Sequence, residues 1–288
     1  MTACSSHHDA FLRPGKWVND VTNRGERYLP LVNAYNAAMH LGHMASYQEA
    51  LRYSYGRKVL DIGCGVGYGA FFLAAYGAGQ VVGVDVSGNA LAYARRVYHH
   101  PVLRYLQASA LQLPFADQTF DFVFSSQVIE HVPSVAAFLA EVKRVLSPTG
   151  FCLITTPNKT LFTPLKTGNN PHHLNEMDLR TYAEYMRQAF PRIRLCGIPQ
   201  NGLWLPPGQS IPVVKPNAEI RPQDFQIQHD NLEQCENLLC LGHKQAGGEF
   251  SAGLPAAYRP AANETAPLFW DSTAAAWAVM GLHPDNTP

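Results

Sequence analysis

The residues of this chain that are best suited to chemistry form a glycine-rich turn between an acid and a helix-compatible run. The segment Val59–Gly69 begins as a short apolar run, reaches Asp61 and then breaks into glycines. Glycines at such a turn let the backbone approach a ligand that side chains would exclude. Further along the chain, a second apolar run ends at Asp85. An acid at the tip of the second strand of an α/β sheet can accept hydrogen bonds from a ribose diol, so the pattern predicts a site for a nucleoside-type cofactor.

The glycine spacing discriminates between two such cofactors. A dinucleotide site requires G-x-G-x-x-G, whose third glycine lets a helix approach with its N-terminus facing a pyrophosphate. Here the glycines stand at 63, 65, 67 and 69, and the position of that third glycine is Tyr68. The carboxylate of Asp61 would also repel a pyrophosphate, whereas it suits the α-amino group of S-adenosylmethionine. We therefore predict that S-adenosylmethionine, and not a nicotinamide dinucleotide, is the cofactor.

Residues Val59–Gly67 and Val82–Ser87 closely resemble the first two motifs of the class I S-adenosylmethionine-dependent methyltransferases. The following Leu-Pro-Phe loop, Phe-Asp strand, Glu-His-Val segment and Pro-x-Gly turn look like the small-molecule branch of that superfamily. The chain is most similar to bacterial members found beside sugar-transfer and natural-product genes. It shares with them the elements Gly25–Pro30 and Asn170–Glu176, and the resemblance covers roughly residues 24–243.

The motifs and the resemblance together assign the cofactor a set of residues near the predicted strand ends. We expect the ribose on Asp85 and the adenine between Val86 and the turn at Ser109 and Ala110. The full predicted set is Asp61, Gly63, Cys64, Gly65, Gly67, Asp85, Val86, Ser109, Ala110 and Gln127. Ser109 stands where the family usually carries an acid that holds the adenine amino group. It either accepts that bond without a charge, which predicts weaker binding, or only turns the chain while the Ala110 backbone and stacking hold the adenine.

Methyl transfer from a sulfonium requires alignment of a nucleophile and, for a hydroxyl, removal of its proton. The candidate bases near the ends of the fourth and fifth predicted strands are Glu130, His131, His172 and His173. His131 follows the fourth strand at the carboxyl edge, where open α/β sheets bind ligands, and an imidazole pKa suits proton removal from a phenol or sugar hydroxyl. The alternative is that His131 caps or packs the following helix. We expect the segment Asn170–Glu176 to close over the substrate with one histidine pointing inward.

The pair Glu130–His131 also resembles the Glu-x-x-Glu-His metal site of ubiquinone-pathway O-methyltransferases. Gln127 stands where the first acid of that site would be, which leaves two of its three protein ligands. The adjacent histidines 172 and 173, with Glu176, could complete a site from another loop, but adjacent histidines diverge in most backbones and form poor chelates. The sequence therefore predicts no metal.

Composition excludes several other classes of protein. At 288 residues the chain can bury one large core, or one core with an added lobe. Lys plus Arg and Asp plus Glu number 22 each, so no net field would recruit nucleic acid or an anionic membrane. No run approaches the ~18 apolar residues of a spanning helix, and the start lacks a basic-then-apolar signal. Six cysteines without a C-x-x-C pair predict reduced thiols in a cytoplasmic protein.

Strand and helix patterns alternate along the middle of the chain. Strands are expected near 58–62, 80–85, 102–107, 120–125 and 150–156, and helices near 67–76, 87–98, 134–146 and 178–190. The resemblance implies two last strands at 192–198 and 237–243, the final one antiparallel. This order predicts an α/β fold, namely a doubly wound, mostly parallel, seven-stranded sheet of the Rossmann-like methyltransferase type.

We expect three parts in the chain. Residues 1–55 form an N-terminal segment with one or two helices capping the cofactor entrance, residues 56–244 the methyltransferase domain, and residues 245–288 a tail. Within the domain, the proline-rich insertion 199–235 should pack near the substrate mouth, although a plain surface loop is the alternative. The aromatic-containing tail could dock on its own chain, dock on a partner in a homodimer, or hang free.

The leading hypothesis for function is S-adenosylmethionine-dependent O-methylation of a small molecule, a sugar or a secondary metabolite, by in-line methyl transfer. One alternative is an enzyme of the same fold that uses the cofactor without transferring methyl, such as a cyclase. Another is a cofactor-binding assembly protein. The segment Ser125–Val128 replaces the Asn-Pro-Pro-Tyr type of motif, which disfavours methylation of DNA adenine or of protein glutamine.

Overall fold

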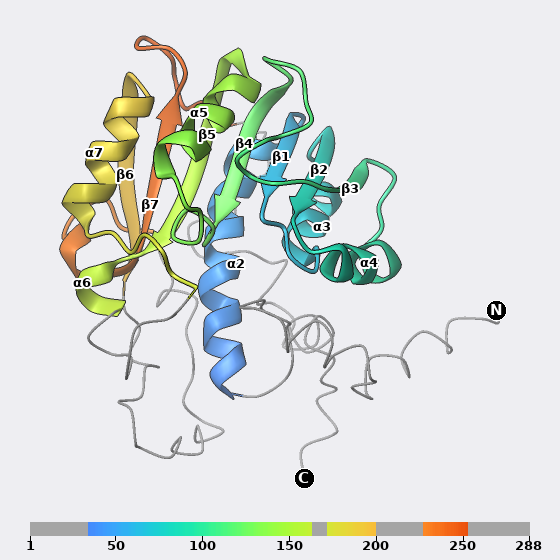
Figure 1. Ribbon diagram of the computed structural model, residues 1–288, viewed down its shortest axis with the longest axis horizontal. Helices are drawn as coiled ribbons and strands as arrows, with labels where there is room; N and C mark the ends of the chain where they lie inside the picture. The colour runs from blue at the N-terminus through green and yellow to red at the C-terminus, as the bar shows by residue number, and fades with distance from the viewer. Residues whose placement is uncertain (1–33, 163–171, 200–226, 253–288) are drawn as a thin grey trace, which may run out of the picture.

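The computed structural model describes residues 34–162, 172–199 and 227–252 (Figure 1). These residues form a seven-stranded sheet in the order β3-β2-β1-β4-β5-β7-β6. The strands are β1 (Lys58–Ile62), β2 (Gln80–Asp85), β3 (Leu103–Gln107), β4 (Phe120–Ser126), β5 (Leu146–Pro157), β6 (Arg192–Pro199) and β7 (Cys235–His243). The helices are α2 (Ala34–Ser54), α3 (Tyr68–Ala75), α4 (Gly88–Val97), α5 (Val135–Val145), α6 (Lys159–Phe162) and α7 (Leu179–Ala189), with a 3-10 turn at Leu232–Gln234.

The order of the strands reverses beside β1, and this reversal positions the site. The chain runs outward from β1 through β2 to β3 and then returns to place β4 on the other side of β1, all in parallel pairs. At such a reversal the connections leave β1 and β4 on opposite faces, which opens a crevice at their carboxyl ends. Only β7 is antiparallel, between β5 and β6. The predicted fold class, including the antiparallel last strand, is confirmed.

Helices cover both faces of the sheet, which explains its apolar composition. In Figure 1, α5 and α7 lie on one face while α2 and α3 lie on the other. Strand β4 shows the consequence: Phe122 and Phe124 join the core under α2 and α3, while Phe120 and Val123 join the core under α5 and α7. A strand buried on both faces reads as a nearly continuous apolar run.

The helices begin where the sequence supplies polar caps. The side chain of Ser87 accepts a hydrogen bond from the amide of Ala90 at the start of α4, and Ser134 and Asp178 cap α5 and α7 in the same way. Each cap satisfies an amide that has no partner within its own helix. These caps fix the starts of three helices within one residue of the predicted positions.

The structure moves several predicted strand ends, and three of these shifts follow from how the strands pair. Strand β5 begins earlier than predicted because Leu146 pairs with Phe120 across an irregularity in the ladder. Strand β6 extends to Pro199, which pairs with Cys235 at the start of β7. Both residues were assigned to the insertion, but a proline is tolerated at the end of a strand, where its missing N–H breaks no central ladder.

Other predictions meet the structure only in part. Within the predicted helical run from Val32 to Tyr55, the described residues form one helix, α2. The described cysteines, Cys64, Cys152, Cys196, Cys235 and Cys240, are all buried free thiols. The Gly25–Pro30 element, residues 200–226 of the insertion and the tail aromatics Tyr258, Phe269, Trp270 and Trp277 lie outside the described residues, whereas Phe250 of the tail packs against Phe151. No described helix combines the length and the apolar character needed to cross a membrane.

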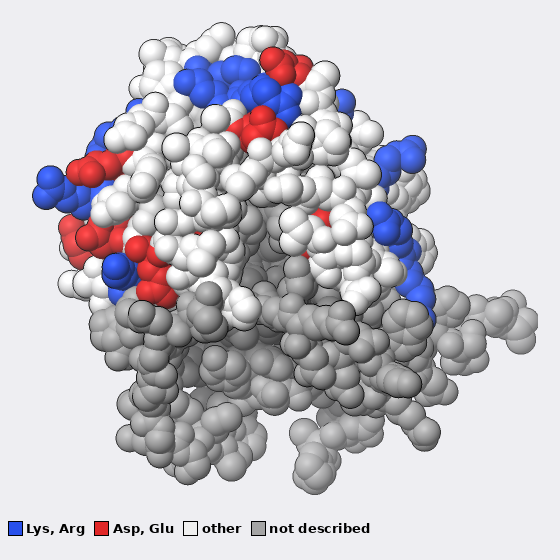
Figure 2. Space-filling view, in the orientation of Figure 1, with Lys and Arg blue, Asp and Glu red and all other residues white. Residues whose placement is uncertain are grey.

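On the face seen in Figure 2, Lys and Arg gather in small separate groups and most of the described surface carries no charge.

Candidate active site

The glycine turn after β1 leaves its backbone open at one position. Gly63, Gly65 and Gly67 all have positive φ angles, of 75°, 54° and 88°, a region that residues with a Cβ rarely adopt. A Cβ on Gly63 would meet Val128 at 2.2 Å, whereas a Cβ on Gly65 would meet nothing within 4 Å. The turn is therefore packed against the protein at Gly63 and faces open space at Gly65, as the approach of a ligand to the backbone requires.

Asp61, before the turn, is a buried acid with one uncommitted oxygen. It is 0% exposed, and its Oδ2 accepts a hydrogen bond from the Tyr47 hydroxyl at 3.0 Å. Its Oδ1 is buried with no hydrogen-bond partner among the described residues. Burial raises the pKa of Asp61 to about 7, the Tyr47 bond opposes that rise, and the nearby Asp85 adds to it. A buried carboxylate oxygen without a donor fits the cationic amino group of S-adenosylmethionine.

Asp85 ties the second strand to the glycine turn. Its carboxylate accepts hydrogen bonds from the amides of Gly65 at 3.0 Å and Ser87 at 2.8 Å. The next residue, Val86, is a large apolar side chain that is 59% exposed. An acid fixed beside the open Gly65, followed by an exposed apolar side chain, fits a ribose and an adjoining adenine.

The remaining predicted cofactor residues have local roles as well. The Ser109 hydroxyl accepts a hydrogen bond from the amide of Leu111 at 3.2 Å, so the chain-turning role is present and the adenine contact stays a prediction for Ser109 and for the half-buried Ala110. Cys64 is buried, and burial raises the pKa of its thiol. The Gln127 side chain donates to Thr155 Oγ1 and Asn237 Oδ1, at 3.2 Å each, which anchors it to β5 and β7.

Helix α2 contributes a residue that the site prediction omitted. Besides its bond to Asp61, the Tyr47 ring packs so tightly on the first turn of α3 that a Cβ on Gly69 would lie 1.9 Å from it. One helical turn earlier, His43 Nδ1 lies 3.1 Å from the Tyr68 hydroxyl. The four-residue spacing of His43 and Tyr47 places both on one helical face, and that spacing is the signal that could have found Tyr47.

On the other side of the crevice, a loop distant in sequence is pinned to the end of β4. The backbone carbonyl of Glu130 accepts hydrogen bonds from the amides of Leu174 at 2.8 Å and Asn175 at 3.0 Å. The Asn175 side chain also donates to the carbonyl of Val132. At the base of the crevice, the Ser125 hydroxyl donates to the Ile62 carbonyl at 3.1 Å and joins β4 to β1. These bonds bring the segment before α7 against the connection between β4 and α5.

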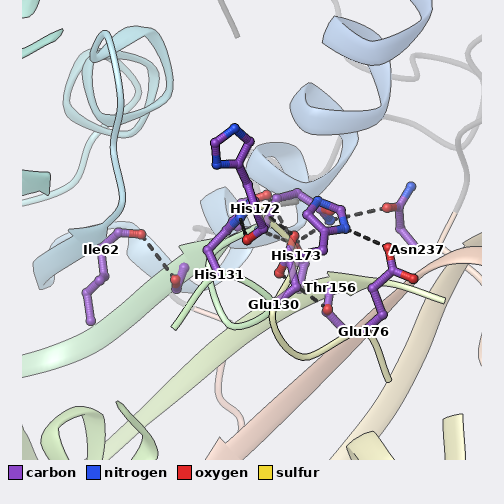
Figure 3. Close-up of polar contacts among 12 residues, drawn as sticks. Ile62, Glu130, His131, Thr156, His172, His173, Glu176 and Asn237 are labelled. Atoms are coloured by element: carbon purple, nitrogen blue, oxygen red, sulfur yellow. Dashed lines mark hydrogen bonds and ion pairs between the residues drawn. The ribbon is translucent and has the colours of Figure 1, made fainter. Parts of the chain in front are cut away.

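Three of the four predicted catalytic side chains meet there (Figure 3). One ligand-capable atom each from Glu130, His131 and His173 lie within 4.8 Å of one another, and the two imidazole rings are 4.8 Å apart in an edge-on arrangement. Glu130 is 0% exposed. The side chain of His172 is exposed and points away from the other two histidines. We call Glu130, His131 and His173 the acceptor-side cluster.

Neighbouring groups orient the members of the acceptor-side cluster. His131 Nδ1 bonds to the backbone carbonyl of His172 at 2.9 Å, and His173 Nδ1 bonds to Glu176 Oε1 at 2.8 Å. The hydroxyl of Thr156, on β5, donates to Glu130 Oε2 at 3.3 Å. Glu176 was predicted only as a partner of the histidine pair, and Thr156 was not predicted, because no local pattern shows that β5 passes beneath Glu130.

The fold and the open glycine turn are those of a Rossmann-like methyltransferase, and comparison with known proteins agrees. Residues 60–154 match the family model described as "Methyltransferase domain". A probable S-adenosylmethionine-dependent methyltransferase of Mycobacterium tuberculosis is 35% identical over 180 residues, which cover 62% of this chain and 64% of that relative. A fatty-acid O-methyltransferase of Mycolicibacterium smegmatis is 37% identical over 101 residues, or 35% of this chain and 37% of that protein. The crystal structure of an S-adenosylmethionine-dependent methyltransferase from Mesorhizobium loti has a TM-score of 0.52 at 19% identity, covering 70% of this chain and 97% of that one.

Residues 60–154 therefore carry a methyltransferase domain, and the chain is similar in sequence to S-adenosylmethionine-dependent methyltransferases. The alignment to the mycobacterial relative spans less than two thirds of that protein, and the structural likeness bears on the fold alone.

Proposed function

We propose that this protein transfers a methyl group from S-adenosylmethionine to an oxygen of a small-molecule acceptor. One observation carries the proposal: the carboxyl edge of a single sheet holds both the glycine turn that is open at Gly65 and the acceptor-side cluster. The two sets lie after β1, β2 and β4, on either side of the point where the strand order reverses. Ligands of open α/β sheets bind at that point.

The residues on the cofactor side would bind and orient S-adenosylmethionine. Asp61 would hold the amino group through Oδ1, which lacks a donor, and Asp85 would hold the ribose beside the open backbone of Gly65. When bound, S-adenosylmethionine supplies a methyl group already activated by a positive sulfur. The chain itself therefore needs only to align the acceptor and lower the cost of removing its proton.

The acceptor-side cluster would assist removal of the proton from the acceptor. His173 is oriented by a carboxylate, Glu176, and His131 by a backbone carbonyl. Two imidazoles held beside a buried acid can stabilise the anionic form of an acceptor hydroxyl. Leu174, which follows His173, is 58% exposed and offers an apolar surface to the rest of the acceptor. The oxygen specificity of the fatty-acid O-methyltransferase relative supports an oxygen acceptor, and the sugar or secondary-metabolite class is our proposal from the sequence resemblance.

The experiment is an incubation of the purified full-length protein with S-adenosylmethionine and a panel of hydroxylated small molecules. Formation of S-adenosylhomocysteine together with a methylated product would support the proposal. Calorimetry with S-adenosylhomocysteine, run in parallel, reports cofactor binding without any acceptor. Tight binding with no turnover on any hydroxyl acceptor, but with turnover on amines, would overturn the oxygen assignment. Conversion of an acceptor without S-adenosylhomocysteine would favour the cyclase alternative.

A further inference from the structure

We propose that the acceptor-side cluster is a binding site for one divalent transition-metal cation, with Glu130, His131 and His173 as its protein ligands. The sequence predicts no metal because Gln127 replaces one acid of the pattern that Glu130 and His131 resemble. The fold supplies a third ligand from elsewhere, since the loop pinned to the Glu130 backbone brings His173 into place. This inference rests on the proposed function only for what the cation would do, not for whether it binds.

The hydrogen bonds of the two imidazoles determine which ring nitrogen can bind a cation. A carbonyl oxygen only accepts, so His131 Nδ1, bonded to the His172 carbonyl, must carry the proton. The same holds for His173 Nδ1, bonded to the Glu176 carboxylate. In each neutral ring the lone pair is then on Nε2. Metal-binding histidines are commonly held in this way, with the other ring nitrogen donating to a carboxylate or a carbonyl.

The carboxylate of Glu130 completes the set. Its Oε2 accepts from the Thr156 hydroxyl, while its Oε1 lies 3.9 Å from His131 Nε2. Two imidazole nitrogens and a carboxylate oxygen therefore lie within 4.8 Å of one another, and each of these three atoms can donate a lone pair to a cation. Ligands bound tetrahedrally at about 2.0–2.2 Å lie roughly 3.3–3.6 Å apart, so small rotations of the partly exposed His131 would close the site.

The ligand types select the class of cation. Imidazole nitrogens suit zinc, iron, cobalt, nickel and copper, whereas magnesium and calcium prefer oxygen ligands. Three protein ligands leave at least one coordination position open, as in metal sites that bind a water or a substrate. We therefore expect Zn²⁺ or a related cation to bind, and Mg²⁺ to bind far more weakly.

A cation here would lower the pKa of the acceptor hydroxyl. The acceptor oxygen would take the open position, its O–H bond would break, the proton would leave to water, and the oxygen would stay bound to the cation as an alkoxide or phenoxide. A bound divalent cation lowers the pKa of a coordinated O–H by several units. His131 and His173 would then act as ligands and not as proton acceptors.

The test measures metal binding to the full-length protein directly. Chelator-treated protein is titrated calorimetrically with ZnCl₂, and with MgCl₂ for comparison, and Co²⁺ is added separately to record its visible absorption. We expect one Zn²⁺ per chain and the visible bands of a Co²⁺ ion with nitrogen and oxygen ligands. Glu130→Gln and His173→Asn should each weaken Zn²⁺ binding at least tenfold. His99→Ala, which removes an exposed imidazole of another adjacent histidine pair, should retain the wild-type stoichiometry.

Circular dichroism confirms that each variant is folded, and because His173 is in a loop, its variant remains informative if the Glu130 variant does not fold. Absence of stoichiometric Zn²⁺ and Co²⁺ binding, or equal binding by His173→Asn and wild type, would overturn the metal site. The proposed function would survive that result if S-adenosylhomocysteine still forms after chelation. Conversely, stoichiometric Zn²⁺ binding without any binding of S-adenosylhomocysteine would support the metal site and overturn the proposed function.

Discussion

The two halves of the crevice are built in different ways. The cofactor half depends on backbone geometry and on contacts between neighbouring strands: the glycines with positive φ, and the bonds from Gly65 and Ser87 to Asp85. The acceptor half depends on side chains from segments far apart in the chain, and the amides of Leu174 and Asn175 on the carbonyl of Glu130 hold it together.

This difference assigns different work to the two halves. Under the proposed function, a turn formed by backbone atoms binds a cofactor whose structure does not vary, so its side chains need little variation. A cluster assembled by a pinned loop can change its acceptor by changing the loop, without disturbing the sheet. Changes in the cofactor half should therefore alter binding, whereas changes in the acceptor half should alter turnover.

The largest effect should come from His173→Ala. Loss of an imidazole that promotes removal of the acceptor proton or stabilises the resulting anion should lower turnover by about 10²–10⁴-fold, while the affinity for S-adenosylhomocysteine stays within error. His172→Ala is the neighbouring comparison. Because the His172 backbone carbonyl bonds to His131 while its side chain points away from the other two histidines, we expect a loss below tenfold. Equal losses for the two variants, appearing mainly in KM, would mean that the cluster only aligns the acceptor.

A smaller effect, in binding instead of turnover, is expected for Asp85→Ala. The substitution removes charge-assisted hydrogen bonds to the ribose and should weaken S-adenosylhomocysteine binding by about 1.5–3 kcal/mol, roughly 10- to 150-fold. Calorimetric titration measures the change. Asp121→Ala is a control that also removes an acid bonded to a backbone amide, that of Lys58, but at the opposite edge of the sheet. If Asp85→Ala binds S-adenosylhomocysteine with unchanged affinity, Asp85 does not hold the ribose.

The pH dependence of cofactor binding tests Asp61. Because its pKa is raised to about 7, the carboxyl is largely protonated at pH 6 and cannot attract the cationic amino group. Affinity for S-adenosylhomocysteine should rise with pH, by up to about tenfold per unit below the pKa, and level off above pH 8. The stability of the cofactor-free protein should depend on pH in the opposite direction. Between pH 4 and 7 the Asp61 carboxyl is ionised in the unfolded chain but protonated in the folded one, so the free energy of unfolding falls as pH rises. Asp61→Asn should show neither dependence.

The smallest effect is expected at Ser109. Ser109→Asp should leave cofactor affinity unchanged or tighten it by about 1 kcal/mol, because a charged acceptor for the adenine amino group is stronger than a neutral one. An aspartate can also keep the bond to the Leu111 amide that Ser109 makes now. Severe weakening in a folded variant would show that adenine does not lie beside this turn.

The sequence alone predicts the order of the elements and the glycine turn after β1. Helices capped by Ser87, Ser134 and Asp178 begin where they were predicted, because a cap and an apolar stripe are local signals. Strand ends were less accurate, since the pairing of Pro199 with Cys235 depends on where two distant strands meet. The glycine turn was identifiable because positive φ angles demand glycine within a few consecutive residues.

The acceptor half was decided by tertiary structure. The sequence names Glu130, His131 and the histidine pair, but not which histidine points inward or that Thr156 and Glu176 hold the cluster. Nor does it show that Tyr47 reaches Asp61 from α2. A local pattern specifies backbone conformation and burial, because both repeat over a few residues. The orientation of a side chain toward a partner on another segment depends on how sheet and loop pack together, and no short stretch of sequence contains that information.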